Sequence, residues 1–348
     1  MILIYDQIWD EVPAPASLIE LKTAARRALP VGASSTLEEA EQLSRQLLED
    51  LDPAESIVAY GGGSVLDKTK LAVWNLHAKI RPYISRGRAG IVTIPVENSL
   101  DVTLIPTTLG TGSEANSNAI VQVGSHRRRL VMQRGAGSFA HCHVPDAYAG
   151  LTLKQVKHAT LEILLRAVGI ASVVEEADAA VFLNFAREAA EYARRVCVMD
   201  LPQEDEQLMG RIAELSALTH QVPLTSKNTL WVWPLWYVAN ELSSLADVSK
   251  LDATVALARA VIPRTEELGY GSNSVIREIE ESLEEPLEEF VTRVGGPLEE
   301  DVLERIAGVS AEALADQVRS QWAGGILPIL ASREFLIEAL EVPEHARN

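Results

Sequence analysis

Two glycine-rich stretches, at residues 61–70 and 105–118, each follow a short apolar run that has the character of a buried strand. In the first stretch, three glycines followed by Ser64 allow backbone N–H groups to approach a bound pyrophosphate closely. The helix expected after Ser64 adds the positive end of its dipole at the same place. Together the two stretches predict a nucleotide-binding crevice.

Short apolar runs alternate with helical patterns over the first 150 residues. The runs are MILIY, ALPVG, SIVAY, IVTIPV and VTLIP, and the expected helices cover 16–28, 37–51 and the segment after Ser64. This alternation predicts a doubly wound α/β dinucleotide-binding domain over 1–150. From 151 to 348 helical spacing dominates, which predicts an all-α substrate or catalytic domain. The glycine-containing breaks at 268–274 and 295–297 are expected to be helix-ending loops.

Composition excludes several classes of protein. The formal net charge of −18 argues against a nucleic-acid partner, because phosphate backbones are bound through clustered Lys and Arg. No apolar run reaches the length of a membrane span. The apolar run MILIY ends at Asp6 and has no basic segment before it. We therefore interpret this run as a first strand and not as a signal peptide. Two cysteines give no disulfide framework, which fits a cytoplasmic protein. The glutamates at 278–304 alternate with apolar residues and predict a solvated amphipathic face.

The two glycine-rich stretches match two signatures of one family. The first is GGGS, two variable residues, Asp, one variable residue and Ala-Lys; the residues that match it are Gly61, Gly62, Gly63, Ser64, Asp67 and Lys70, with Thr69 in place of Ala. The second is Pro-Thr-Thr-x-Gly-Thr-Gly-Ser-Glu, which runs unbroken from Pro106 to Glu114. With both in this order, the chain resembles the iron-containing alcohol dehydrogenases, in the group that includes dehydroquinate synthase and glycerol dehydrogenase. The resemblance implies a dehydroquinate synthase-like fold.

The same resemblance implies a bound nicotinamide dinucleotide, NAD or NADP. It places Gly62, Gly63 and Ser64 at the pyrophosphate and Thr107, Thr108 and Ser113 nearer the ribose and nicotinamide. The cofactor-binding residues also include Gly61, Asp67 and Gly110. Considered one at a time, these residues have structural alternatives. Asp67 could place a negative charge in the first turn of a helix, and Gly110 and Gly112 could be required only by the conformation of a tight turn. Asp6 ends the first strand and corresponds to the acid that binds an adenosine ribose and favours NAD.

The chain differs from this family at the positions that hold the metal ion. The family holds its ion with one Asp and three His, and Leu164, Val168, Trp236 and Lys250 stand in those four places. Asn240 stands where the family often has a further active-site His. We therefore expect no metal cofactor. The remaining histidines do not rebuild the site: His141 and His143 are interpreted as strand neighbours, and His158 and His220 as structural or surface residues.

The leading hypothesis is a metal-independent NAD(P)-dependent oxidoreductase acting on CH–OH, with Lys250 and Asn240 as catalytic residues. Lys250 would supply positive charge or, with a pKa lowered by burial, accept the hydroxyl proton; the alternative is that it points to solvent. Divergent members resemble dehydrogenases of daptide-type ribosomal peptide biosynthesis, which implies oxidative decarboxylation of a peptide's C-terminal threonine.

The competing hypothesis is a degenerate scaffold subunit that binds the cofactor and serves a biosynthetic partner protein. A cyclase like dehydroquinate synthase ranks behind both. The expected partners are a small-molecule or peptide substrate and further copies of the chain.

Overall fold

The structure is a computed structural model. It describes residues 1–50, 52, 55–86, 90–124, 127–135, 139–202, 205–221, 234–266, 272–322 and Ile337. The chain divides into two compact units: the first consists of Met1–Val156 and Met199–Gln221, and the second of Lys157–Val198 and Val222–Asn348. The first segment of the first unit ends at Val156, six residues after the predicted boundary at 150. Met199–Gln221, which we expected in the helical domain, belongs to the first unit. The reason is long-range packing, because α7 (Glu206–Gln221) contacts η2 (Ser113–Ala115) and η3 (Pro145–Tyr148).

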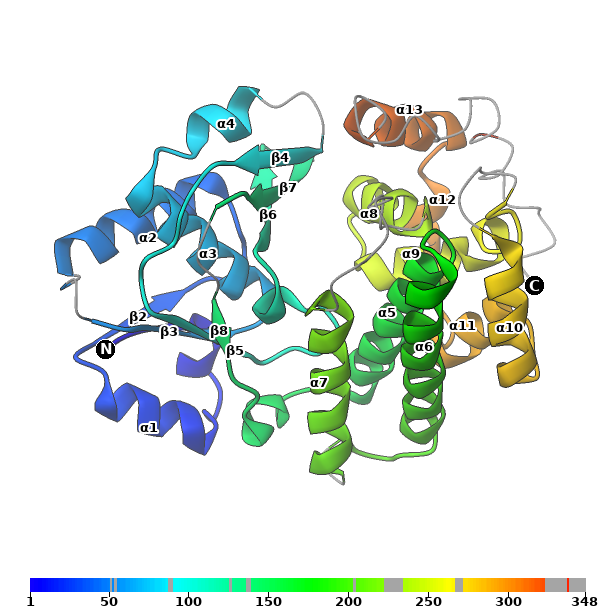
Figure 1. The fold of residues 1–348 in the computed structure, drawn as a ribbon, viewed down its shortest axis with the longest axis horizontal. Coiled ribbons are helices and arrows are strands. Elements are labelled where there is room, and N and C mark those ends of the chain that lie inside the picture. The colour runs from blue at the N-terminus through cyan, green and yellow to red at the C-terminus, as the bar shows by residue number, and fades with distance from the viewer. Residues whose placement is uncertain are drawn as a thin grey trace. The chain divides into compact units, whose positions relative to one another are not determined.

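A five-stranded parallel sheet forms the centre of the first unit (Figure 1). Its strands, in the order β2-β1-β3-β5-β8, are β2 (Arg27–Val31), β1 (Ile2–Asp6), β3 (Ile57–Gly61), β5 (Val102–Pro106) and β8 (Ala140–His141). The three central strands are almost continuously apolar because both faces of a parallel sheet are buried. All five strands end at the same edge, which brings Asp6, Gly61, Pro106 and His141 to one side of the unit.

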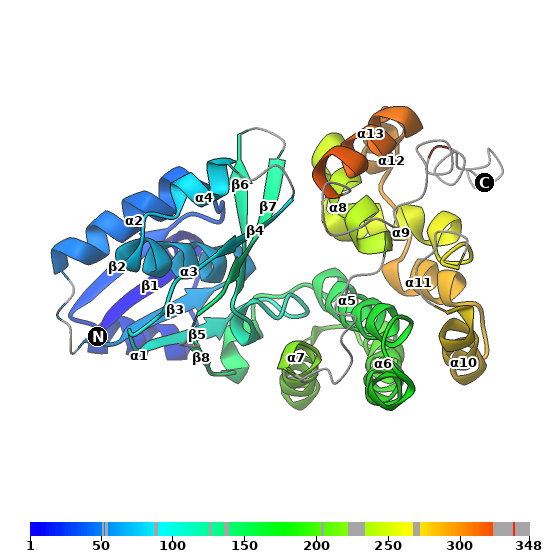
Figure 2. The same ribbon diagram turned by 45° about the horizontal axis from the view of Figure 1, so that its top comes forward.

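Helices cover both faces of this sheet (Figure 2). Ile2, Ile4 and Ile57 point into one core, which also holds residues of α2 (Leu37–Asp50), α3 (Gly63–His77) and α4 (Arg81–Arg86). The alternate residues Leu3 and Tyr5 point into a second core with Leu18 of α1 (Ala16–Ala24). The expected doubly wound arrangement is confirmed.

A second sheet of three strands belongs to the same unit and was not foreseen in the sequence. It has the order β4-β7-β6, where β4 is Ile91–Ile94, β7 is Arg127–Gln133 and β6 is Asn118–Val123. β6 and β7 are antiparallel, whereas β4 and β7 are parallel. α3 packs against β6, so this sheet is attached to the helix that follows the glycine turn.

The second unit is helical in its described part, as expected. Its helices are α5 (Leu153–Ala171, which begins in the first unit), α6 (Glu176–Cys197), α8 (Pro234–Ala246), α9 (Lys250–Val261), α10 (Asn273–Leu283), α11 (Leu287–Gly295), α12 (Glu300–Ala307) and α13 (Ala311–Trp322). α11 ends at Gly295, and Gly296 has a φ of 78°, which confirms the predicted break there. The break at 268–274 lies mostly outside the described residues.

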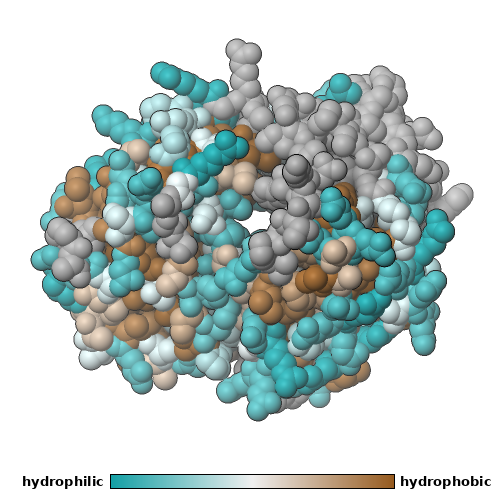
Figure 3. Space-filling view, viewed as in Figure 1, coloured by the Kyte–Doolittle hydropathy of each residue, from teal (hydrophilic) through white to brown (hydrophobic). Residues whose placement is uncertain are grey.

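The glutamate-rich segment behaves as its pattern predicts. α10, α11 and α12 bury their apolar positions, among them Ile279 and Phe290. Figure 3 shows mainly hydrophilic side chains on the outer side of α10. No described helix has both the length and the apolar character needed to cross a membrane.

Candidate functional site

The turn from β3 to α3 is shaped by its glycines. A Cβ atom at Gly61 would lie 2.6 Å from Cβ of Val65, and one at Gly62 would lie 3.1 Å from Cγ2 of Thr108. The Thr107 N–H donates to the Gly61 carbonyl at 3.0 Å, and the Gly63 N–H donates to the Thr108 hydroxyl at 3.3 Å. The structure therefore brings the two glycine-rich stretches together into one turn, which we call the glycine cradle, and the close approach of Val65 requires glycine at position 61.

The loop after β5 continues this cradle. Gly110 and Gly112 have φ angles of 84° and 60°, in the left-handed region that favours glycine. A Cβ at Gly112 would lie 1.8 Å from the ring of His220 on α7, and the Gly112 carbonyl accepts a 2.7 Å hydrogen bond from the Asn116 side chain. Gly112 is therefore held closely between two segments of the first unit. Gly110, which we assigned to the cofactor, has a clear structural reason to be glycine.

Asp67 and Ser113 have structural partners that the sequence did not reveal. The Ser113 hydroxyl donates to Oδ1 of Asp67, and the Ile120 N–H donates to Oδ2 at 2.8 Å. Nζ of Lys70 lies 3.0 Å from Oδ1 of Asp67 and donates to the carbonyl oxygens of Ser113, at 2.8 Å, and Asn118. All three side chains are buried. These bonds position the loop, and the assignment of Asp67 and Ser113 to the cofactor site stays a prediction.

Charged residues also meet at the ends of β1 and β2. Asp6 ends β1 as expected, and its carboxylate accepts from the Ile8 N–H at 3.1 Å. Lys68 on α3 is only 2% exposed, and its Nζ donates to the Gly32 carbonyl at 2.7 Å. Nζ of Lys68 lies 3.7 Å from Oε2 of Glu39. Burial lowers the pKa of Lys68, although Glu39 and Asp6 oppose that shift.

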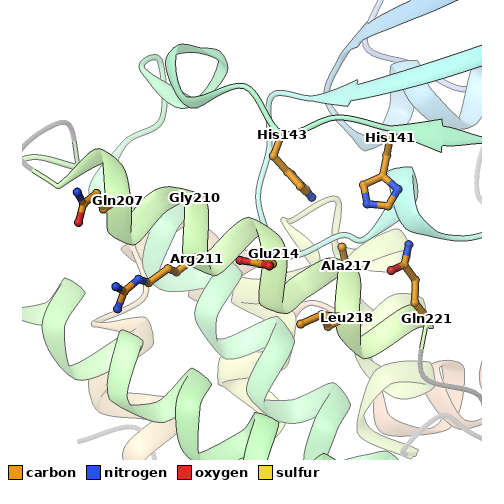
Figure 4. Close-up of a pocket in the computed structure, with 9 residues that line it drawn as sticks. All are labelled: His141, His143, Gln207, Gly210, Arg211, Glu214, Ala217, Leu218 and Gln221. Carbon is orange, nitrogen blue, oxygen red and sulfur yellow. The ribbon is translucent and has the colours of Figure 1, made fainter.

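A pocket of about 560 Å³ lies between the end of β8 and α7, within the first unit (Figure 4). The ring of His143 points from the β8 side toward Glu214 on α7. Nδ1 of His143 lies 2.9 Å from the Tyr148 hydroxyl, while its buried Nε2 has no hydrogen-bond partner. The lining residues are His141, His143, Gln207, Gly210, Arg211, Glu214, Ala217, Leu218 and Gln221. His141 and His143, which the sequence presented only as strand neighbours, thus line one pocket.

The stability of the protein is expected to depend on pH through His143. Burial, with a smaller contribution from His141, lowers the pKa of His143 to about 4. In the unfolded chain His143 takes up a proton near pH 6.5, whereas in the folded protein it does so only near pH 4. Protonation therefore favours the unfolded chain, and the folded protein loses stability as the pH falls from 6.5 toward 4. The free energy of unfolding should fall by about 2–3 kcal/mol across this window. Urea unfolding from pH 7 to 4 should show a shallower fall for His143→Gln than for the wild type or the exposed control His77→Gln; parallel curves would contradict this.

Lys250, in the second unit, is paired with a carboxylate. Its Nζ donates to Oε1 of Glu162 on α5, and Arg166 lies 3.9 Å from the same oxygen. Burial alone would raise the pKa of Glu162, but the charges of Lys250 and Arg166 outweigh it and hold that pKa below its usual value. Nζ of Lys250 also lies 4.9 Å from the ring centre of Trp236. The pairing with Glu162 favours the charged ammonium, so positive charge is the role that this geometry supports rather than proton acceptance.

Asn240 lies on α8 in the same unit and is 6% exposed. Its amide donates to Oε1 of Glu241 at 3.2 Å, and the same oxygen accepts from the Trp322 indole at 2.9 Å. This buried network holds the Asn240 amide in place, and its assignment as catalytic stays a prediction.

The residues do not fit the metal that the family resemblance implies. Leu164 and Val168 are buried apolar residues of α5, and Trp236 and Lys250 contact each other. Within the described part of the chain, no group of three or more His, Cys, Asp or Glu side chains could hold a metal ion. The turn after β3, by contrast, has the features that a dinucleotide pyrophosphate requires, namely glycine backbone at Gly62 and Gly63 followed at once by the N-terminus of α3.

One family model matches part of the chain. Residues 16–137, which contain both glycine stretches, match the model described as iron-containing alcohol dehydrogenase. This match covers about a third of the chain and shows a similarity to that family over the glycine-rich segment. The match supports an oxidoreductase that acts on CH–OH groups with a nicotinamide dinucleotide. No curated protein sequence matches this chain.

Solved structures share the fold of this chain over nearly its whole length. NADH-dependent butanol dehydrogenase A from Thermotoga maritima has a TM-score of 0.70 and 16% identity, covering 98% of this chain and 90% of its own. An iron-containing alcohol dehydrogenase from the same organism has a TM-score of 0.69 and 16% identity, with 98% and 92% coverage. Sulfoacetaldehyde reductase from Bifidobacterium kashiwanohense, solved with NAD+, has a TM-score of 0.68 and 17% identity, with 97% and 89% coverage. At these identities the likeness shows the fold, which is the predicted one.

Proposed function

We propose that the protein is a metal-independent NAD(P)-dependent dehydrogenase that oxidises a secondary alcohol or reduces the corresponding ketone. The observation that carries the proposal is the glycine cradle, in which Gly63 is hydrogen-bonded to Thr108 across the two family signatures. Gly61 lets α3 start directly against β3, since a Cβ there would lie 2.6 Å from Cβ of Val65, and the N-terminus of α3 is the kind of site that binds a pyrophosphate. The family match over residues 16–137 supports the same reaction class.

The proposed reaction needs positive charge at the substrate oxygen. A bound dinucleotide supplies the hydride acceptor when the alcohol is oxidised. The oxygen becomes more negative as the hydride leaves, and a metal commonly stabilises that charge in such enzymes. Lys250 is our candidate for this task, since Glu162 holds its ammonium charged and in place. Glu162 and Arg166 then act as positioning residues for Lys250.

Replacing Lys250 with methionine is expected to lower kcat/KM by about 100-fold, because a charge at a developing oxyanion is worth several kcal/mol. The measurement is NADH formation with a panel of secondary alcohols. Lys157→Met, also in the second unit, should leave the rate near that of wild type. Unchanged turnover in Lys250→Met would remove this residue from the mechanism.

Metal independence has its own test. Activity should survive dialysis against a chelator, and metal analysis of the active protein should find less than one equivalent of iron or zinc. Loss of activity on chelation, restored by one added divalent metal, would contradict this part of the proposal.

For the substrate, we propose a peptide with a C-terminal threonine in specialised biosynthesis. Oxidation of its β-hydroxyl gives a β-keto acid, which loses carbon dioxide readily, so hydride transfer alone would complete an oxidative decarboxylation. Incubation of such a peptide with NAD should yield equal amounts of NADH and carbon dioxide. NADH formation with simple alcohols and none with the peptide would exclude this substrate while keeping the reaction class.

The second candidate function is a scaffold subunit for a partner enzyme, favoured by the replacement of all four family ligand positions. Calorimetry with NAD and NADP separates the two candidates. Micromolar binding of either dinucleotide supports the dehydrogenase, and binding of neither supports the scaffold.

A further inference from the structure

The indole of Trp236 lies beside the ammonium group of Lys250 in the second unit. Trp236 belongs to α8 and Lys250 begins α9, and these two helices pack against each other. Nζ of Lys250 stands over the indole, 4.9 Å from the ring centre. An aromatic face attracts an ammonium group, and tryptophan attracts it most strongly among the aromatic side chains. Trp236 is therefore an electrostatic partner of Lys250, in addition to Glu162 on α5.

These two partners act on Lys250 in different ways. Glu162 carries a negative charge that offsets the charge of the ammonium, whereas the indole carries no net charge. Oε1 of Glu162 also lies 3.9 Å from Nη2 of Arg166, so the carboxylate attracts two cations at once. A lysine has a flexible four-carbon stem, and a single ion pair leaves Nζ free to move around the carboxylate. A second contact from another helix fixes the ammonium and does not cancel its charge.

The indole of Trp236 is itself held by two further rings. It makes edge-to-face contacts with Tyr237 and Trp322, whose ring centres lie 5.2 and 5.8 Å from its own. Both of these rings are buried. The indole N–H of Trp322 donates to Oε1 of Glu241 at 2.9 Å, which fixes that ring. Buried residues thus set the orientation of Trp236, so its face presents a defined place for the ammonium.

The ammonium is fixed but still open to a ligand. The side chains of Lys250 and Glu162 are 25% and 23% exposed, and Trp236 is half-buried. A partly exposed ion pair adds little to the stability of a protein, so stability alone gives little reason to order this lysine. An oxygen that becomes negative during a reaction, by contrast, is stabilised best by a charge that already stands in position.

We propose that Trp236 is a positioning residue of the proposed reaction: its indole face holds the ammonium of Lys250 in place without neutralising its charge. The inference rests on the proposed function, since it presumes that Lys250 stabilises the substrate oxygen. Trp236 acts through Lys250 in this role and needs no contact with substrate or cofactor. Tyr237 and Trp322 support the indole from behind.

The test is a double-mutant cycle on the full-length protein, with kcat and KM measured for NAD and a secondary alcohol. Trp236→Leu removes the aromatic face and should lower kcat about 3- to 30-fold, with the KM for NAD unchanged. Trp236→Phe keeps a weaker aromatic face and should retain part of the lost rate. In the background of Lys250→Met, Trp236→Leu should lower kcat less than about twofold, because the group that it positions is gone.

Urea unfolding of the same four proteins measures the contact without any activity. The fall of the unfolding midpoint in the double variant should be smaller than the sum of the falls in the two single variants. Phe185→Leu is the matched control, because Phe185 is also a half-buried aromatic residue of the second unit with an edge-to-face contact, to Phe182 at 5.8 Å. It should leave kcat close to that of wild type. If Trp236→Leu fails to fold, Trp236→Phe takes its place in the cycle.

The outcomes separate this inference from the proposed function. Equal losses of kcat from Trp236→Leu in both backgrounds, or unfolding midpoints that add without interaction, would overturn the inference alone. Full turnover in Lys250→Met would remove Lys250 from the mechanism and Trp236 with it. A wild type that oxidises no secondary alcohol and binds neither dinucleotide would overturn the proposed function and the inference together.

Discussion

Replacing Gly61 with alanine is expected to abolish dinucleotide binding and to lower the free energy of unfolding by about 1–3 kcal/mol. The new methyl group would lie 2.6 Å from Cβ and 2.7 Å from Cγ1 of Val65. No rotamer of Val65 relieves the first contact, because a Cβ atom is fixed by the backbone of α3. The helix would have to move away from β3, which would open the turn. Calorimetry with NAD and urea unfolding would measure the two effects.

The matched control for this substitution is Gly210→Ala. A Cβ at Gly210 would meet no atom within 4 Å, and the residue lies inside α7. Alanine stabilises a helix by about 0.5–1 kcal/mol relative to glycine, so this variant should be as stable as wild type or slightly more stable. Dinucleotide binding by Gly61→Ala at wild-type affinity would show that the turn tolerates a side chain.

Replacing Lys70 with methionine is expected to have the largest effect on stability. Lys70 is fully buried, and its Nζ contacts Asp67 and three oxygens of the Ser113 and Asn118 segments. Its loss leaves the carboxylate of Asp67 buried without its countercharge. Breaking a buried pair in this way costs about 3–5 kcal/mol. Urea unfolding should show a loss of this size, compared with less than about 0.5 kcal/mol for the exposed control Lys79→Met.

A double variant separates the lost charge pair from the lost packing. Asp67→Asn combined with Lys70→Met removes both charges, so it should be more stable than Lys70→Met alone. If the two single substitutions were simply additive, the ion pair would not be the source of Lys70's contribution.

The fold was predictable where the sequence pattern is local. The runs around Ile2, Ile57 and Leu104 are apolar because they are buried on both faces, and the expected parallel sheet follows from that. The β6–β7 hairpin was missed. β7 begins with three consecutive arginines at 127–129, which have the character of an exposed basic run and not of a strand. The return of α7 to the first unit was also missed. Its apolar spacing predicts a helix but carries no information about which unit it packs against.

The candidate site was also predictable only where the signal is local in sequence. Gly61 and Gly62 were identified because a glycine requirement is visible in the residue type itself. The partners of Asp67 were not, since Ser113 and Ile120 are about 50 residues away in sequence. Lys68 and Glu39 gave no signal for a similar reason: a lysine on a helix is usually solvated, and only the approach of Gly32 shows that this one is buried.

The division of the first unit into two chain segments has a consequence for synthesis on the ribosome. The chain leaves this unit after Val156, returns at Met199 and leaves again after Gln221. Domains generally fold as units as they emerge, beginning with the N-terminal one. Here the emerging sheet has to wait for 65 further residues before α7 can pack on η2 and η3. In a nascent chain that ends at residue 156, the surfaces of η2 and η3 that α7 covers in the complete protein are therefore still exposed, and a chaperone can bind them.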